Sequence, residues 1–288
     1  MTSATQRHDS AATAAAKPVL DWFFALAALA VVGVYIRAIY FTPLEARQGA
    51  AQKIYYIHVP SAIASYCAVT ITALASIVFL WLHDERADRL AEASAEVGLI
   101  FMSMVLVTGP LWAHNQWGAW WVWWDLRLTL SLFLWFLIVG YLVLRGAIEE
   151  PAMRGRYSAV LAVLAALLIP FIHLSVYFSA AHMHPDPIVL QPSKPKLPPE
   201  MLLTFLLGIG AFTWLCLALI RSQDAESIAR GCASRSGARI PMIDTYGPYH
   251  AAYIIAAVVY AAYSFSVWWR AKRARERLRH ARRDLVDR

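Results

Sequence analysis

The chain has 288 residues, of which 59% are hydrophobic and only 16% charged, and its mean hydropathy is +0.49. This composition excludes a soluble globular domain and favours a polytopic membrane protein. The formal net charge is +7, and residues 270–288 hold nine Lys and Arg against three Asp and Glu. A basic tail beside an apolar stretch is typical of an anchor on the lipid bilayer, so we expect no nucleic-acid binding.

Motifs for several chemistries are missing. The three cysteines, Cys67, Cys216 and Cys232, form no CxxC or CxxCH motif, so neither a c-type cytochrome nor a thiol oxidoreductase is predicted. The sequence also has no GxxxxGK[ST] loop for nucleotide phosphates. We therefore expect a binding protein and not an enzyme.

Taken in chain order, the sequence predicts an all-α, polytopic integral membrane six-helix bundle plus one additional C-terminal transmembrane helix. Residues 1–17 are polar and predicted to be a disordered tail, residues 18–221 form the six-span domain, and residues 222–241 are a polar linker. A single span with a basic tail follows at residues 242–288. Apolar runs long enough to cross a bilayer lie at 20–41, 57–82, 96–113, 127–146, 157–180, 201–220 and 248–269.

Charge and parity predict the topology. The connection between the fourth and fifth spans carries Arg145, Arg154 and Arg156, whereas the one before it carries no Lys or Arg between Trp112 and Asp125. The positive-inside rule therefore places the third connection outside and the N-terminus inside. The first, third and fifth connections must lie on the same side of the membrane.

The third connection is a tryptophan-rich segment, residues 112–129, which holds six of the twelve tryptophans. Trp117, Trp120, Trp121 and Trp124 are spaced 0, +3, +4 and +7, so they share one face if the segment is helical. A flat apolar platform suits a flat apolar ligand such as a porphyrin. The alternative is an amphipathic helix lying in the membrane interface.

Histidines flank this segment on the same side of the membrane. His58 begins the second span, and His184 lies in the fifth connection, where His182 is an alternative to it. Each histidine alone is better explained as a hydrogen-bonded or solvated residue, but two imidazoles from separate connections beside the tryptophans predict a bis-axial haem site. His173 lies within the fifth span and is a second candidate, while His114 is expected only to orient the tryptophans.

Two charged residues close the segment. We predict that Asp125 and Arg127 form an ion pair that ties the tryptophan-rich segment to the fourth span. Contact between Arg127 and a haem propionate is the alternative.

Three motifs stand out: residues 117–129 read WGAWWVWWDLRLT, residues 57–62 read IHVPSA, and residues 169–176 read IPFIHLSV. Together they resemble the cytochrome c maturation protein C (CcmC) family of haem-handling proteins. The resemblance implies that His58 and His184 are axial ligands of haem b on the periplasmic face of the bacterial inner membrane. It implies that residues of the tryptophan-rich segment form the surface on which haem lies: Trp117, Gly118, Trp120, Trp121, Trp123, Trp124 and Asp125. Arg127 joins these candidate haem contacts through its charge alone.

The resemblance also implies partners. Members of the family deliver haem to a membrane-anchored periplasmic haem chaperone, in a complex with two ABC-transporter subunits and a small single-span protein. Residues 242–288 resemble that small subunit, cytochrome c maturation protein D. A seventh span would carry the basic tail outside, against the positive-inside rule, so we hypothesise that Met242 is a natural start.

Two other functions are alternatives to haem delivery. A membrane b-type haem electron-transfer subunit would ligate haem between His58 and His173, and it would not need six tryptophans in one connection. A haem transporter across the bilayer would need a charged intramembrane pathway, which the six spans do not offer.

Overall fold

Every regular element that the computed structural model describes is a helix. The described residues are 21–178, 183–184 and 197–236. Six of the helical stretches are long and apolar enough to cross a membrane, which confirms the predicted all-α bundle of six spans. The helices are α2 (Trp22–Ile36) with a π-helical turn (Arg37–Phe41), a 3-10 turn (Ala50–Ile54) leading into α3 (Tyr55–Leu82), α4 (Glu85–Trp117), α5 (Leu126–Ala147), α6 (Pro151–Phe178) and α7 (Pro199–Ser236).

Several helices are longer than their apolar cores. α4 begins at Glu85 and not near residue 96, because Asp84 caps it and acidic residues occupy its first turn. α7 continues to Ser236, so residues 222–236, which we predicted to be linker, are helical. α3 begins before Pro60, which lies inside the helix and not at its start. The predicted tail 1–17, the rest of the linker and the span in 242–288 lie outside the described residues.

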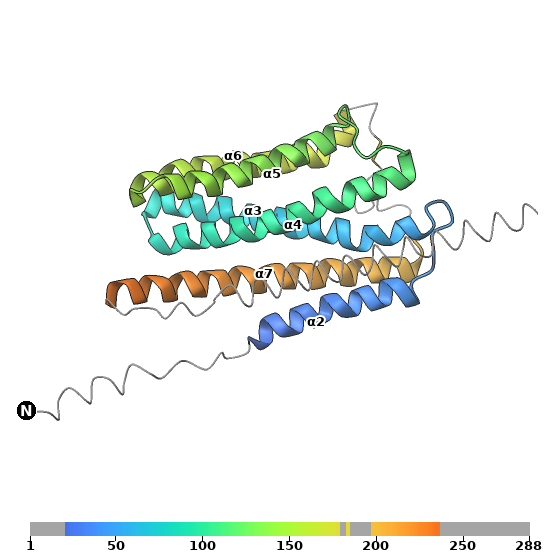
Figure 1. The fold of residues 1–288 in the computed structure, drawn as a ribbon, viewed down its shortest axis with the longest axis horizontal. Helices are drawn as coiled ribbons and strands as arrows, with labels where there is room; N and C mark the ends of the chain where they lie inside the picture. The colour runs from blue at the N-terminus through green and yellow to red at the C-terminus, as the bar shows by residue number, and fades with distance from the viewer. Residues whose placement is uncertain (1–20, 179–182, 185–196, 237–288) are drawn as a thin grey trace, which may run out of the picture.

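α3 is the central helix and packs against α4, α6 and α7, while α2 lies against α7 and α5 lies against α4 and α6 (Figure 1). Small residues bring α3 and α4 together. The Ser65 hydroxyl donates to the Gly98 carbonyl oxygen over 3.0 Å, and a Cβ at Gly98 would lie 3.4 Å from Ala68. Close approach of this kind is how helices associate where lipid removes the hydrophobic driving force.

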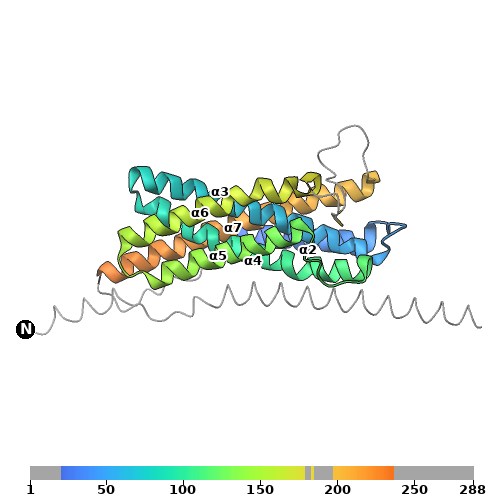
Figure 2. The same ribbon diagram turned by 90° about the horizontal axis from the view of Figure 1, so that it is seen from above.

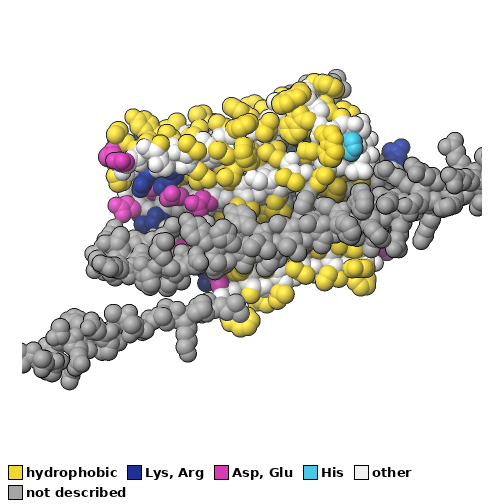
Figure 3. Space-filling view, viewed as in Figure 1, with side chains coloured by type: hydrophobic (Ala, Val, Ile, Leu, Met, Phe, Trp, Pro, Cys, Tyr) yellow, Lys and Arg dark blue, Asp and Glu magenta, His cyan; other side chains and the backbone are white. Residues whose placement is uncertain are grey.

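One end of the bundle is charged. Arg145 of α5 is buried and donates to Asp88 over 2.6 and 2.8 Å and to Glu92 over 2.9 Å, both on α4. Lys, Arg, Asp and Glu side chains gather at this end in the space-filling view (Figure 3). A fork of two hydrogen bonds from arginine to one carboxylate fixes the crossing of α4 and α5.

The opposite end is where the candidate site lies. The α2–α3 and α4–α5 connections lie there in both views, together with the C-terminal end of α6 and the N-terminal end of α7 (Figures 1 and 2). We call this end, which holds the tryptophan-rich segment, the tryptophan end.

Candidate functional site

The tryptophan-rich segment is only partly helical. α4 ends at Trp117 because Gly118 adopts φ +74°, a left-handed conformation that favours glycine and closes the helix through its N–H to the His114 carbonyl oxygen. Residues 118–125 form an irregular loop before α5. The segment is therefore not one continuous helix, so the condition under which Trp117, Trp120, Trp121 and Trp124 would share one helical face is not met.

Asp125 ends this loop and caps α5. Its side chain is fully buried, and its Oδ1 accepts hydrogen bonds from the backbone N–H groups of Arg127 at 3.0 Å and Leu128 at 3.2 Å. These are orphan donors of the first helical turn, and an aspartate at the cap satisfies them. The short loop is thereby fixed to the fourth span.

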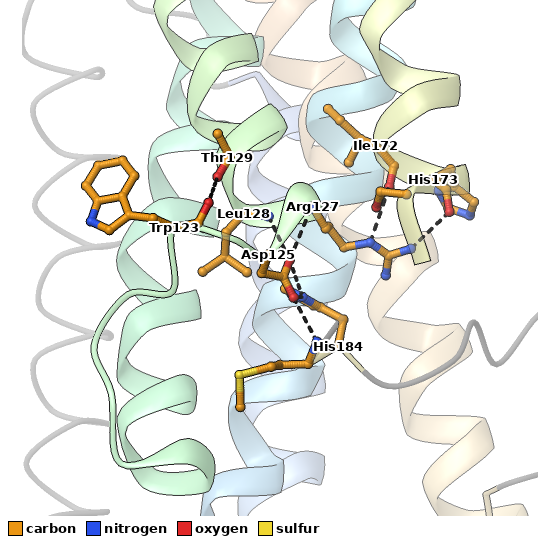
Figure 4. A network of polar contacts seen from close by, with 10 residues as sticks. Trp123, Asp125, Arg127, Leu128, Thr129, Ile172, His173 and His184 are labelled. Carbon is orange, nitrogen blue, oxygen red and sulfur yellow. Dashed lines mark hydrogen bonds and ion pairs between the residues drawn. The ribbon is translucent and has the colours of Figure 1, made fainter. Parts of the chain in front are cut away.

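The same carboxylate holds His184 (Figure 4). Asp125 Oδ2 accepts from the Met183 N–H at 3.0 Å, and the Nδ1 atom of His184 lies 3.1 Å from Oδ2 and 3.2 Å from Oδ1. Burial raises the pKa of the Asp125 carboxyl, but the hydrogen bond and charge of His184 and the amide donors outweigh burial and hold this pKa well below its usual range. An ionised acceptor at Nδ1 fixes the tautomer of His184 in which Nε2 carries the lone pair.

The predicted ion pair between Asp125 and Arg127 is wrong. Arg127 donates from Nε to the Ile172 carbonyl oxygen at 3.3 Å and from a terminal nitrogen to the His173 carbonyl oxygen at 3.0 Å (Figure 4). Asp125 instead pairs with His184, because α5 turns the Arg127 side chain towards α6. The segment is still tied to the fourth span, by the cap and not by an ion pair.

His58 lies in the first turn of α3 and is held by α4. Its Nδ1 is 2.8 Å from the Thr108 hydroxyl oxygen, and that hydroxyl donates to the Met104 carbonyl oxygen at 2.6 Å. Because the Thr108 proton is already used, the hydroxyl accepts from His58 Nδ1, and Nε2 carries the lone pair. Nε2 makes no hydrogen bond within the part of the chain that the structure describes. His58 lies close enough to His184 for the charge of one imidazole to act on the other.

A chain of contacts through two tryptophan rings joins Gln48, in the first connection, to His184. The Trp117 ring meets the His184 ring edge to face, with centroids 5.5 Å apart, and the Trp112 ring meets Trp117 in the same way at 5.1 Å. The Trp112 N–H donates to the side-chain oxygen of Gln48 at 3.0 Å. These contacts place the first, third and fifth connections against one another, as parity predicts.

The remaining tryptophans divide into two kinds. Trp120, Trp123 and Trp124 are exposed, and His114 stacks on Trp120 with an interplanar angle of 6°. The Trp121 N–H is buried and has no partner among the described residues. His114 therefore contacts Trp120, one of the tryptophans that it was expected to orient.

The other histidines lie apart from this arrangement. The His173 side chain is exposed, and its imidazole makes no hydrogen bond or ring contact with any described residue. His182 lies outside the described residues. Within the described ranges, no group of three or more His, Cys, Asp and Glu side chains is placed to hold a metal ion.

Sequence reasoning missed Thr108 and Gln48. Each is a polar residue that pairs with a singled-out residue far away in the chain, His58 and Trp112 respectively. Thr108 offered a signal, since a hydroxyl in an apolar span needs a partner. Gln48 offered none.

Comparison with known proteins places this arrangement in a family. The family model described as "Heme exporter protein C" (CcmC) matches residues 4–237. The chain belongs to this family. Proteins named heme exporter protein C are similar to it in Haemophilus influenzae, at 32% identity over 73% of this chain and 87% of the relative, and in Bradyrhizobium diazoefficiens, at 34% over 74% and 80%. The Escherichia coli protein of that name is 36% identical over 55% of this chain and 66% of its own length.

Family membership identifies the chain as a multi-pass membrane component that handles haem for cytochrome c maturation. The family match ends at residue 237, so residues 238–288, including the segment that resembles cytochrome c maturation protein D, lie beyond it. The six-span domain thus lies within the part of the chain that the family model matches.

Proposed function

We propose that this CcmC family member binds haem b at the tryptophan end, with His58 and His184 as the two axial ligands, and delivers it to the periplasmic haem chaperone. One observation carries the proposal. Both imidazoles have Nδ1 occupied by a fixed acceptor, Thr108 for His58 and Asp125 for His184. A histidine held in this way presents Nε2, the atom that binds haem iron.

Other groups at this end suit the haem macrocycle. The buried Trp121 N–H has no partner among the described residues, and a polar edge of haem would satisfy it. Arg127 uses one terminal nitrogen and Nε on backbone carbonyl oxygens, and its other terminal nitrogen faces no described acceptor. That nitrogen is suited to a haem propionate. Trp117, Gly118, Trp120, Trp123 and Trp124 would supply apolar contacts, with Asp125 behind His184.

Charge supports placing this site on the periplasmic face of the inner membrane. Arg145 near the end of α5, and Arg154 and Arg156 near the start of α6, lie at the opposite end of the bundle, which the positive-inside rule assigns to the cytoplasm. The N-terminus is then cytoplasmic, and His58, His184 and the tryptophan-rich segment face the periplasm.

The proposed role includes partners but no covalent chemistry. Exposed Trp120, Trp123 and Trp124 offer an apolar surface beside the haem, which suits contact with the chaperone. We include in the same proposal the two ABC-transporter subunits and a small subunit like the one that residues 242–288 resemble. The protein binds, presents and releases haem, and it is therefore not proposed to be an enzyme.

A handover experiment tests this function. The full chain, loaded with haem in lipid nanodiscs, is mixed with the apo periplasmic domain of the chaperone, and the two are separated. We expect haem to appear on the chaperone faster than from free haem at the same concentration, and His184→Ala to abolish the difference. Haem that stays on the chain and cycles reversibly in a redox titration would contradict delivery and support the electron-transfer alternative.

A further inference from the structure

The two proposed haem ligands have different second partners. Nδ1 of His184 donates to the fully buried Asp125 carboxylate, whose two oxygens also accept from the N–H groups of Arg127, Leu128 and Met183, so the group acts only as an acceptor, as an ionised carboxylate does. Nδ1 of His58 donates to the Thr108 hydroxyl, which is neutral and already donates to a backbone carbonyl of its own helix. The two imidazoles therefore differ in the charge behind them.

A charge behind a histidine changes its strength as a ligand. An anionic acceptor draws the Nδ1 proton away from the ring and raises the electron density on Nε2, whereas a neutral hydroxyl does so much less. We propose that Asp125 is a positioning residue that makes His184 the stronger axial ligand, and that His58 is the weaker ligand and the first to leave when haem is released. This inference rests on the proposed haem site.

Asp125 is able to act only through His184. Its side chain is 0% exposed, and both carboxylate oxygens already accept hydrogen bonds from the loop, α5 and the Met183–His184 segment. No surface of the carboxylate remains for haem. Because one group joins the tryptophan-rich segment to His184, movement of the segment would move the ligand as well.

The order of departure follows from how each ligand is held. The Asp125 carboxylate gives His184 a charge-assisted hydrogen bond, and Trp117 packs against the same ring. His58 is supported by one neutral hydrogen bond, and a Cβ at Gly109 would lie only 3.2 Å from its Cε1 atom. The α4 backbone therefore fixes where His58 lies without strengthening its bond to iron.

The test compares Asp125→Asn with Thr108→Val in the full chain in nanodiscs. Asparagine still caps a helix, so α5 is preserved while the charge is lost. We expect Asp125→Asn to weaken haem binding by roughly 10–100-fold, the cost of losing an outer-shell partner, and to make the haem reduction potential more positive. Thr108→Val should change both quantities in the same direction but by less.

The outcomes separate the two proposals. A wild-type spectrum of two histidine ligands that is lost in His184→Ala upholds the haem site. Suppose that the haem site is upheld, but Asp125→Asn changes haem affinity and reduction potential no more than Thr108→Val does. The proposal that His184 is the stronger ligand is then overturned, while the haem site stands. If the wild type shows no such spectrum, the haem site itself fails. Should Asp125→Asn not fold, Asp125→Ser, which also retains a capping side chain, provides the same comparison.

Discussion

Replacing His184 by alanine is expected to weaken haem binding by at least about 100-fold, above the upper limit for loss of an outer-shell partner. The reason is that the variant loses a ligand backed by a buried carboxylate, and no described histidine stands in its place. His58→Ala should lose less, because its imidazole is backed only by Thr108. The measurement is an optical titration of haem into each variant in nanodiscs.

The chain supplies a matched control for this titration. His173 is a histidine at the same end of the bundle whose side chain is exposed. We expect His173→Ala to bind haem within about threefold of the wild type, well short of the roughly 10–100-fold loss that even an outer-shell partner causes. Loss of binding in His173→Ala, with His184→Ala unaffected, would move the site to the fifth span and contradict the proposed ligand pair.

The second large effect concerns stability at the charged end. Arg145→Ala is expected to lower the free energy of unfolding by about 3–5 kcal/mol, because it leaves the part-buried Asp88 carboxylate without its counter-charge. The Arg145 side chain is only 2% exposed and that of Asp88 15%, so water screens the pair poorly. The measurement is chemical unfolding of the purified protein in detergent, followed by circular dichroism.

Arg221 provides the control for that experiment. Its side chain is 64% exposed, and it reaches Asp21 only at 4.0 Å. Arg221→Ala should therefore cost between about 0 and 1 kcal/mol, as is usual for a surface pair. Equal losses in the two variants would show that the pairing of Arg145 with Asp88 contributes no more than an exposed contact.

Much of the bundle was predictable because lipid imposes a simple rule. A segment that crosses a bilayer must be helical and apolar, so the six spans follow from apolar runs alone. The same rule misled us at residues 222–236. Hydropathy reports contact with lipid and not helix formation, and α7 continues as a helix where its sequence becomes polar.

The convergence of the site was predictable from parity, but its contacts were not. Alternating spans bring His58, the tryptophan-rich segment and His184 to one end whatever the detailed packing. The partner of each histidine, in contrast, lies about fifty or more residues away in the chain and is chosen by tertiary packing. Neither contact is encoded by local spacing.

Periodicity alone does not decide the conformation of the tryptophan-rich segment. A spacing of 0, +3, +4 and +7 fits a helix, yet Gly118 ends α4 immediately after Trp117. Glycine after the last helical residue is a known stop signal, so this boundary could have been found. The pairing of Asp125 with His184 could not, because Arg127 is the closer charge in sequence and turns to α6 instead.

The most direct test of the haem site is the optical and electron paramagnetic resonance spectrum of the ferric, haem-loaded wild type, recorded beside the His58→Ala/His184→Ala double variant. Two imidazole ligands predict six-coordinate, low-spin haem in the wild type and loss of that signal in the double variant. A high-spin wild type, or a low-spin signal that survives unchanged in the double variant, would contradict ligation by His58 and His184.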